Sequence, residues 1–256
     1  MATPTTTREY YLPEISSYKN LKTRQVPLVP PKSSEVLVKI HAVTLNRRDL
    51  IIANGQHPVK CAAVTAYNAL HGPVPLKSGD TVLVLGTGVF ALQFAVASGV
   101  TVIATSSSDA KLAIAKKLGA KHLINYKNDP DWDKKVLEVT NGRGVDHVIE
   151  VGGPGTLEKS MSAVRYHGWI HTIGFVSGAG SGQENVIIQS IRKAFSIRGI
   201  QIGSVAQFED MNRLIRANPD VTRPVIDKVF SFDEAKEAYA HLESQAHVGK
   251  VVIKVA

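Results

Sequence analysis

The chain contains a single cysteine, Cys61, among its 256 residues. One cysteine excludes an intramolecular disulfide and any zinc site built from several thiolates. No apolar run approaches the roughly 20 residues that a membrane-spanning helix needs. The N-terminal residues also lack the apolar centre of a secretory signal. We therefore expect a cytoplasmic protein with no membrane partner.

Basic residues are present in excess, but they are not gathered into blocks. The formal charge is +8, while hydrophobic residues make up 44% and charged residues 20% of the chain. This balance is typical of a globular protein and favours anionic ligands. Nucleic-acid binding is disfavoured, because the lysines and arginines are scattered and not interleaved with aromatic residues. A phosphorylated cofactor is the simpler anion.

A glycine turn between an apolar strand and a helix is the most informative motif. The strand Val82–Leu85 stops at Gly86-Thr87-Gly88, and helix-forming residues follow from Val89 to Ser98. In this Gly-x-Gly-x-x-Ala pattern, with Ala91 in the third place, backbone N–H groups can approach a pyrophosphate at the helix N-terminus. The alternative is a turn that serves compact packing only.

From this turn onward, apolar strands alternate with helical segments. Such alternation predicts an α/β fold with a Rossmann-type, doubly wound parallel sheet, whose ligand crevice lies at the carboxyl ends of the strands. The six expected strands are 82–85, 100–105, 122–126, 145–151, 169–173 and 195–202.

Glycines and hydroxyl residues recur at the expected carboxyl ends of these strands. Any one of them could be an ordinary loop residue, but five in register favour a shared dinucleotide site. They are Gly86-Thr87-Gly88, Thr105-Ser106-Ser107, Asn125-Tyr126, Gly152-Gly153 and Gly174-Phe175.

A second, mainly β domain is expected from the two ends of the chain. Residues 35–45 alternate apolar and other side chains, which predicts a strand with one buried face. A short helical turn over 46–55 follows, and a helix over 233–245 precedes a last strand, 249–255. We predict that residues 1–60 and 225–256 form this domain and that 61–224 form the dinucleotide-binding domain.

The residues after the second strand bear on which dinucleotide is bound. NAD-binding folds usually place a carboxylate about 20 residues beyond the glycine turn, where it bonds the ribose 2′-OH. Here the position is occupied by Ser106 and Ser107, with Lys111 nearby and no carboxylate before Asp109. Hydroxyls and an ammonium suit a 2′-phosphate, so NADP(H) is favoured. Alternatively, the serines cap a helix and Lys111 is solvated.

Several segments together resemble the medium-chain dehydrogenase/reductase superfamily, in particular its zinc-independent quinone-oxidoreductase-like and enoyl-reductase-like members. The resemblance implies a nicotinamide-binding Rossmann domain, a GroES-like catalytic domain and a homodimer formed through the sixth strand. The segments are EVLVKIHAVTLNRRDL, CAAVTAYNAL, GDTVLVLGTG, VIATSSSDAKLAIAKKLGA, HLINY, GVDHVIEVGG, IRGIQIGS and GKVVIKV.

The chain departs from this family at two places. A long family stretch between NRRDLIIANGQHP and CAAVTAYNAL is replaced by Pro58-Val-Lys, so the catalytic domain is expected to be truncated. The glycine loop is also about three residues shorter than in the family, or nearly one helical turn.

The resemblance also implies roles for particular residues. It places Asn46 and Thr65 near the nicotinamide, Tyr126 near the adenosine, and Gly174, Phe175 and Val176 along the cofactor. His57 occupies the place of the tyrosine proton donor of enoyl-reductase-like members, although it could equally be a surface residue. The full cofactor-binding set is Thr65, Gly86, Thr87, Gly88, Val89, Ser106, Ser107, Lys111, Tyr126, Gly152, Gly153, Gly174, Phe175 and Val176.

No metal site is expected. The cysteine that a zinc alcohol dehydrogenase resemblance would require near Asn46–Asp49 is absent. His167 and His171, four residues apart, are better explained by packing or surface placement, and Cys61 by burial.

The leading hypothesis is an NADP(H)-dependent, zinc-independent oxidoreductase that reduces an activated C=C, quinone or carbonyl of a small molecule. Two alternatives stay open: a cofactor-binding protein with a non-redox or regulatory role, and an inactive truncated variant.

Overall fold

The computed structural model describes residues 4–55, 62–86, 88–174 and 186–256. The chain divides into two compact units, one made of Met1–Val59 with Val225–Ala256 and the other of Lys60–Pro224. Each unit has its own hydrophobic core. In the part of the chain that the structure describes, no helix combines the length and apolarity needed to cross a bilayer.

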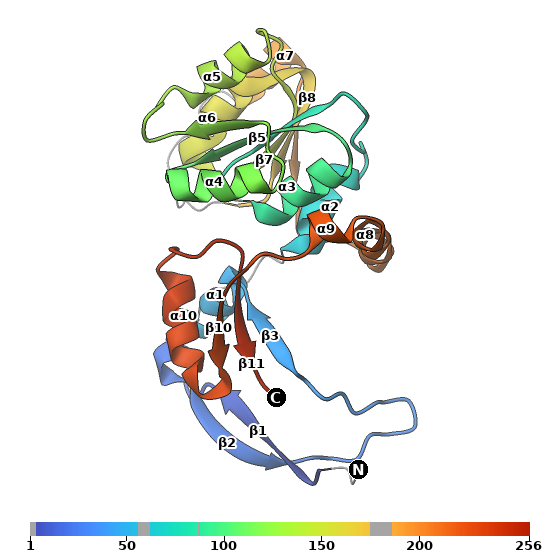
Figure 1. Ribbon diagram of the computed structural model, residues 1–256, viewed down its shortest axis with the longest axis vertical. Coiled ribbons are helices and arrows are strands. Elements are labelled where there is room, and N and C mark those ends of the chain that lie inside the picture. The colour runs from blue at the N-terminus through green and yellow to red at the C-terminus, as the bar shows by residue number, and fades with distance from the viewer. Residues whose placement is uncertain (1–3, 56–61, 87, 175–185) are drawn as a thin grey trace. The chain divides into compact units, whose positions relative to one another are not determined.

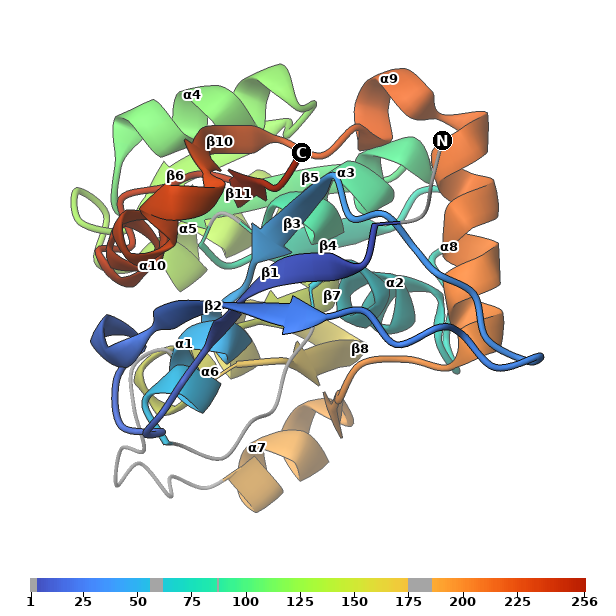
Figure 2. The ribbon, with the colours of Figure 1, turned by 90° about the horizontal axis from the view of Figure 1, so that it is seen from below.

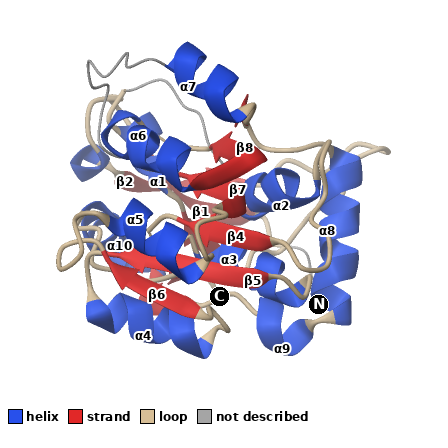
Figure 3. Ribbon diagram, turned by 90° about the horizontal axis from the view of Figure 1, so that it is seen from above, coloured by secondary structure: helices blue, strands red, loops and turns tan. Residues whose placement is uncertain are grey.

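The Lys60–Pro224 unit contains a six-stranded parallel sheet with the spatial order β6-β5-β4-β7-β8-β9. In chain order this is 3-2-1-4-5-6, the strand order of the dinucleotide-binding Rossmann fold. Figure 3 shows β6, β5, β4, β7 and β8 side by side in that sequence. The predicted fold class is therefore confirmed. The strands are β4 (Thr81–Val84), β5 (Thr101–Ser106), β6 (His122–Asn125), β7 (Val145–Glu150), β8 (Val164–Thr172) and β9 (Ser196–Gly199).

Helices cover both faces of this sheet because alternate strand residues point to opposite sides. In β4, Val82 and Val84 belong to one core cluster, whereas Leu83 and the following Leu85 belong to the other. The helices of this unit are α2 (Ala63–His71), α3 (Val89–Ala97), α4 (Asp109–Lys117), α5 (Trp132–Val139), α6 (Pro154–Ala163), α7 (Val186–Lys193), α8 (Val205–Ala217) and α9 (Pro219–Thr222).

The other unit combines a hairpin, a three-stranded sheet and two helices. The hairpin pairs β1 and β2 antiparallel, and the sheet has the order β10-β11-β3. Figures 1 and 2 show α10 beside β10 and β11. The elements are β1 (Thr6–Tyr11), η1 (Tyr18–Asn20), β2 (Lys22–Pro27), β3 (Ala42–Leu45), α1 (Arg47–Ala53), β10 (Ile226–Ser231), η2 (Phe232–Glu234), α10 (Ala235–Glu243) and β11 (Lys250–Lys254).

One strand prediction in this unit was too long. A strand was expected over residues 35–45, but only Ala42–Leu45 is a strand, where it pairs antiparallel with β11. Residues 35–41 have the alternating pattern of a strand without a neighbouring strand to complete it, and an unpaired extended segment is not β-structure.

Candidate functional site

The glycine turn follows β4 at the centre of the six-stranded sheet. Gly86 has φ +63°, a left-handed conformation that favours glycine. Its N–H donates to Thr105 Oγ1 at 3.3 Å, which ties the turn to β5. A Cβ on Gly88 would lie 2.9 Å from Val84 Cγ1, so glycine is also needed there for close packing. The predicted site residue Thr87 lies outside the described residues.

Helix α3 begins directly after this turn at Val89. Its N-cap is Gly88, a residue without a side chain, and its first turn carries no acidic residue. The first N–H groups of a helix have no partner within the helix, and the helix dipole adds positive potential there. The turn and helix end therefore suit a pyrophosphate.

The carboxyl ends of β5 and β6 are joined by a backbone hydrogen bond. The N–H of Tyr126 donates to the carbonyl of Ser106 at 3.0 Å. Tyr126 is exposed, Ser106 is buried and Ser107 is half-buried. This edge therefore brings together the three residues expected near the adenosine half of a dinucleotide.

Ser108 and Asp109 open α4 beside this edge. Ser108 is the N-cap, yet its hydroxyl makes no capping hydrogen bond. Asn125 Nδ2 donates to Asp109 Oδ1 at 2.7 Å, so this carboxylate is already engaged. Lys111 lies in the first turn of the same helix and is half-buried.

A buried carboxylate organises the end of β7. Glu150 Oε1 accepts hydrogen bonds from the N–H groups of Gly152 at 2.7 Å and Gly153 at 3.0 Å. It also accepts from the Thr156 hydroxyl at 2.6 Å, while Oε2 accepts from the Ser160 hydroxyl. Because α6 begins at Pro154, Glu150 holds both the turn and the first residues of that helix.

The predicted glycines beside β7 and β8 are explained by close packing. A Cβ on Gly152 would lie 2.3 Å from Thr156 Oγ1, and a Cβ on Gly174 would lie 2.4 Å from the Val151 carbonyl oxygen. Gly153 has φ +85°. Phe175 and Val176, which were expected to follow, lie outside the described residues.

The remaining predicted residues are in different places. Thr65 is buried in α2 of the Lys60–Pro224 unit. Asn46 is in the other unit, where it caps α1: its N–H donates to Asp49 Oδ2 at 2.7 Å and its side-chain oxygen accepts from Lys250 Nζ. Its side chain therefore has a structural role within its own unit. His57 lies outside the described residues.

A pair of buried histidines lies within the sheet. His147 Nδ1 is 3.0 Å from His171 Nε2, and the two rings stack at 5.3 Å between centroids. Burial lowers the pKa of His171 to about 3, and the neighbouring His147 and Arg198 contribute to the shift. Burial also lowers the pKa of His147, opposed by Asp80 at 3.6 Å. Both imidazoles are therefore neutral near pH 7.

The contact between His147 and His171 also bears on whether His167 and His171 share a site. His167 is exposed and has φ +57°, whereas His171 is buried against His147, so His167 and His171 form no common site. Within the described ranges, no group of three His, Cys, Asp or Glu side chains is arranged to hold a metal ion.

Asp146 forms an ion-pair cluster near the amino end of β7. Burial raises the pKa of this carboxyl, but hydrogen bonds from Arg143, Arg165 and the Thr81 N–H outweigh burial and lower the pKa to about 2. The shortest contacts are 2.7 Å from Arg143 Nη2 and 2.5 Å from Arg165 Nε. The cluster stabilises the sheet at the edge opposite the glycine turn.

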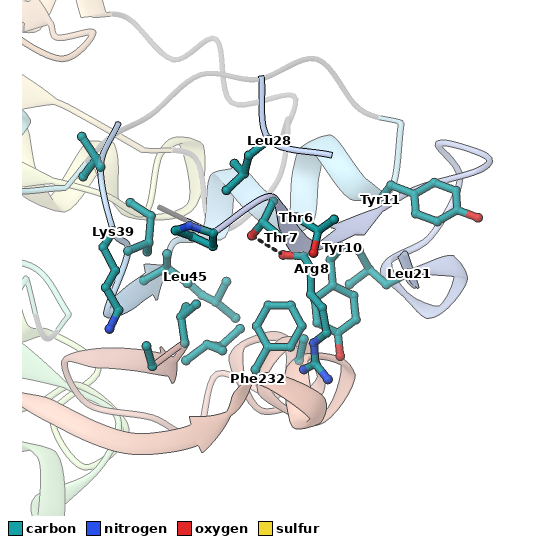
Figure 4. Close-up of a pocket in the computed structure, with 18 of the residues that line it drawn as sticks. Thr6, Thr7, Arg8, Tyr10, Tyr11, Leu21, Leu28, Lys39, Leu45 and Phe232 are labelled. Carbon is teal, nitrogen blue, oxygen red and sulfur yellow. Dashed lines mark hydrogen bonds between the residues drawn. The ribbon is translucent and has the colours of Figure 1, made fainter. Parts of the chain in front are cut away.

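The other unit contains an apolar groove of about 860 Å³. It lies between β1, the segment before β3 and the start of α10, and Figure 4 shows Phe232, Tyr10 and Leu45 around it. A groove of this volume is large enough for a drug-sized molecule or a piece of chain.

Two side-chain arrangements in the Lys60–Pro224 unit are among the features that were not predicted from the sequence. One is Glu150. The available signal was a carboxylate at the end of an apolar strand, shortly before Gly152-Gly153-Pro154. The other is the contact of His147 with His171. Nothing local indicates it, because it depends on how β7 and β8 are aligned.

The geometry fits a nicotinamide dinucleotide. The left-handed Gly86, the start of α3 and the hydroxyls at the end of β5 lie at the carboxyl ends of the strands, in a sheet with the Rossmann strand order. This end of the sheet contains the topological switch point between β4 and β7, where such folds bind ligands.

Comparison with known proteins gives the same family from several directions. The family model described as zinc-binding dehydrogenase matches residues 86–217, just over half of the chain. A zinc-type alcohol dehydrogenase-like protein of Schizosaccharomyces pombe is 52% identical over 202 residues, which cover 76% of this chain and 58% of that relative. The match therefore spans less than two thirds of that relative's length.

Two further relatives match nearly the whole chain. A protein of the same yeast named "Probable quinone oxidoreductase" is 31% identical over 96% of this chain and 72% of its own length. A crystal structure from Sinorhizobium meliloti 1021, provisionally described as an alcohol dehydrogenase, superposes with a TM-score of 0.87 at 26% identity, covering 99% of this chain and 100% of the other. The chain therefore belongs to the medium-chain dehydrogenase/reductase superfamily, as a quinone-oxidoreductase-like member.

Proposed function

We propose that this chain is an NADP(H)-dependent, zinc-independent oxidoreductase that reduces an activated C=C, a quinone or a carbonyl of a small molecule. The observation that carries the proposal is the hydrogen bond from the turn at Gly86 to Thr105, which lies next to Ser106 at the end of β5. The relatives' names, which include a quinone oxidoreductase, support a reduction of this kind.

The preference for NADP(H) rests on the end of β5. A carboxylate would repel a 2′-phosphate, and none occurs from Thr105 to Ser108. The next carboxylate, Asp109, accepts a hydrogen bond from Asn125. Within the described residues, no hydrogen bond is recorded for the hydroxyls of Ser106, Ser107 or Ser108, so helix capping does not account for these serines.

The chain's own residues bind and orient the cofactor in this proposal. The Gly86 turn and the start of α3 hold the pyrophosphate, while Ser106, Ser107 and Lys111 hold the 2′-phosphate. Glu150 supports the neighbouring turn by accepting from the N–H groups of Gly152 and Gly153. The nicotinamide supplies hydride chemistry when bound. His57 is the candidate proton donor.

Zinc independence is part of the proposal. The single cysteine, Cys61, cannot by itself supply a multi-thiolate site. The described residues also offer no group of three metal-ligating side chains.

A homodimer formed through β9 is proposed as well. β9 is the last strand of the sheet, so one edge of it is open to a second copy. The adjacent helix α7 has no buried residue, and its Ile187 and Ile191 are 75% and 74% exposed. An exposed apolar helix next to an edge strand favours a symmetric interface.

Turnover of NADPH tests the function directly. The full chain is incubated with NADPH and a panel of enones, quinones and aldehydes, with and without a metal chelator. We expect oxidation of NADPH with at least one class, at a rate the chelator leaves unchanged. The proposal is wrong if no member of the panel causes NADPH oxidation.

A second candidate is a cofactor-binding protein without redox activity. The open groove of about 860 Å³ in the Met1–Val59 and Val225–Ala256 unit favours it, because a reduced second domain provides less of a dry pocket. Substrate conversion that persists without any nicotinamide cofactor would support this candidate. Failure to bind any dinucleotide would instead favour an inactive truncated variant.

A further inference from the structure

The segment from Val36 to Ile40 is apolar and exposed. Val36, Leu37, Val38 and Ile40 are 82%, 45%, 63% and 48% exposed. Four large apolar side chains in five consecutive residues are not typical of a solvated loop. Figure 1 shows the connection from β2 to β3 running out from the rest of its unit.

The backbone of this segment is also unpaired. Within the described residues, no backbone hydrogen bond is recorded for the N–H or C=O groups of Val36 to Ile40. The strand that follows, β3, pairs with β11 on one side only and is the edge of its sheet. An unpaired, alternating edge is a template for another strand.

The same segment forms one wall of the apolar groove. Leu37, Val38 and Ile40 line it together with residues such as Tyr10 and Phe232. A partner that covers this wall must therefore supply apolar side chains as well as backbone hydrogen bonds. A small apolar ligand would supply only the first.

Two copies of the segment, aligned antiparallel, have complementary side chains at facing positions. When Glu35-Val-Leu-Val-Lys39 is aligned antiparallel with a second copy about Leu37, Glu35 of each copy faces Lys39 of the other. Val36 then faces Val38, and Leu37 faces its own equivalent. Opposite charges and β-branched pairs at facing positions stabilise antiparallel strands.

We propose that residues 35–39 pair antiparallel with the same residues of a second copy of this chain, about a twofold axis at Leu37. The pairing joins two β10-β11-β3 sheets into one continuous sheet and covers the apolar wall of each groove. Pro30 and Pro31, which lack an N–H, end the ladder.

The charges needed for this pairing are available. Lys39 is exposed and makes no ion pair within the described part of the chain. Glu35 is exposed, and its Oε2 accepts the N–H of Lys32 at 3.0 Å. The interface is independent of the proposed oxidoreductase function and of the β9 interface, since it uses one unit alone.

Charge reversal tests the register. Glu35→Lys and Lys39→Glu each place like charges opposite one another at both ends of the ladder, and we expect each to weaken self-association roughly tenfold. The double variant Glu35→Lys/Lys39→Glu restores opposite charges and should restore the association. Sedimentation equilibrium over a range of concentrations measures it. The proposal is overturned if the single variants associate as the natural chain does, or if the double variant does not recover.

A disulfide cross-link tests the twofold axis independently of the sedimentation measurement. In a Cys61→Ala background, Leu37→Cys places two thiols opposite one another, whereas Ile40→Cys places its two thiols roughly 20 Å apart along the ladder. We expect a disulfide-linked dimer for Leu37→Cys and none for Ile40→Cys under mild oxidation. Absence of the Leu37→Cys dimer, or equal cross-linking of both, would overturn the pairing. The pairing would also be overturned if the chain remained monomeric at all concentrations while an apolar naphthalene dye bound in its groove.

Discussion

The Glu150 carboxylate accepts a 2.7 Å hydrogen bond from the N–H of Gly152, directly after β7 at the switch point of the sheet. The same side chain also accepts from Gly153, Thr156 and Ser160, so one buried residue fixes the turn and the start of α6. The turn that follows β7 is therefore held by a residue that need not touch the proposed cofactor.

Replacing this carboxylate by an amide leaves a buried donor without an acceptor. We expect Glu150→Gln to lower the free energy of unfolding by about 1–3 kcal/mol and to weaken dinucleotide binding. Urea denaturation measures the first effect and fluorescence titration with NADPH the second. Glu158→Gln, on the exposed surface of the same helix, is the matched control. Equal denaturation midpoints for the two variants would contradict the role of Glu150.

The buried histidine pair predicts a pH dependence of stability. The pKa of His171 in the folded chain is about 3, below its ordinary value of 6.5. Between these values the unfolded chain binds a proton that the folded chain does not. The stability linked to His171 is therefore complete above about pH 6.5 and falls as the pH decreases toward 3.

We expect His171→Gln to flatten the dependence of unfolding free energy on pH between about 6.5 and 4. His167→Asn is the control, because that residue is exposed and asparagine tolerates its φ of +57°. Asp146 causes a separate loss of stability at lower pH, between its ordinary pKa of 3.8 and its folded-state pKa of about 2. An unchanged slope in His171→Gln would show that the pair does not control this window.

Lys111 is expected to distinguish the two cofactors. Because its ammonium is proposed to contact the 2′-phosphate, Lys111→Ala should weaken NADPH binding roughly tenfold or more and leave NADH binding unchanged. Lys117→Ala, in the last turn of the same helix, removes an equal charge away from the site. Calorimetry with both cofactors measures the difference. Equal losses for the two variants would indicate only a general effect of charge.

His57 can be tested as the proton donor once a substrate is known. A donor of this kind contributes roughly 10²–10⁴-fold to turnover, so His57→Phe should lower kcat by that order. His41→Phe, another histidine of the Met1–Val59 and Val225–Ala256 unit, provides the comparison. Unchanged turnover in His57→Phe would remove this residue from the mechanism.

The six-stranded sheet could be predicted because its signals are local. Strands β4 and β5 are mostly apolar runs, and the turn at Gly86 requires the residue type that the sequence supplies. The bounds differ most at the last two strands: β8 is Val164–Thr172 and not 169–173, and β9 is Ser196–Gly199 and not 195–202. Helix α8 was not anticipated. Its sequence mixes apolar and polar side chains, and only Met211 among them is buried.

The parts that could not be predicted depend on contacts between distant residues. The strand expected over 35–45 is shortened because the alternating pattern does not reveal whether a neighbouring strand exists. The pairing of His147 with His171 depends on the register of β7 and β8. Glu150 has no local partner before α6 folds back onto it.

Binding of NADPH and NADH to the full chain, measured by calorimetry at one salt concentration, tests the proposed function most directly. The combination of a glycine turn at Gly86 with serines and Lys111 after β5 predicts a saturable NADPH complex that is tighter than the NADH complex. Tighter binding of NADH, or no binding of either dinucleotide, would contradict it.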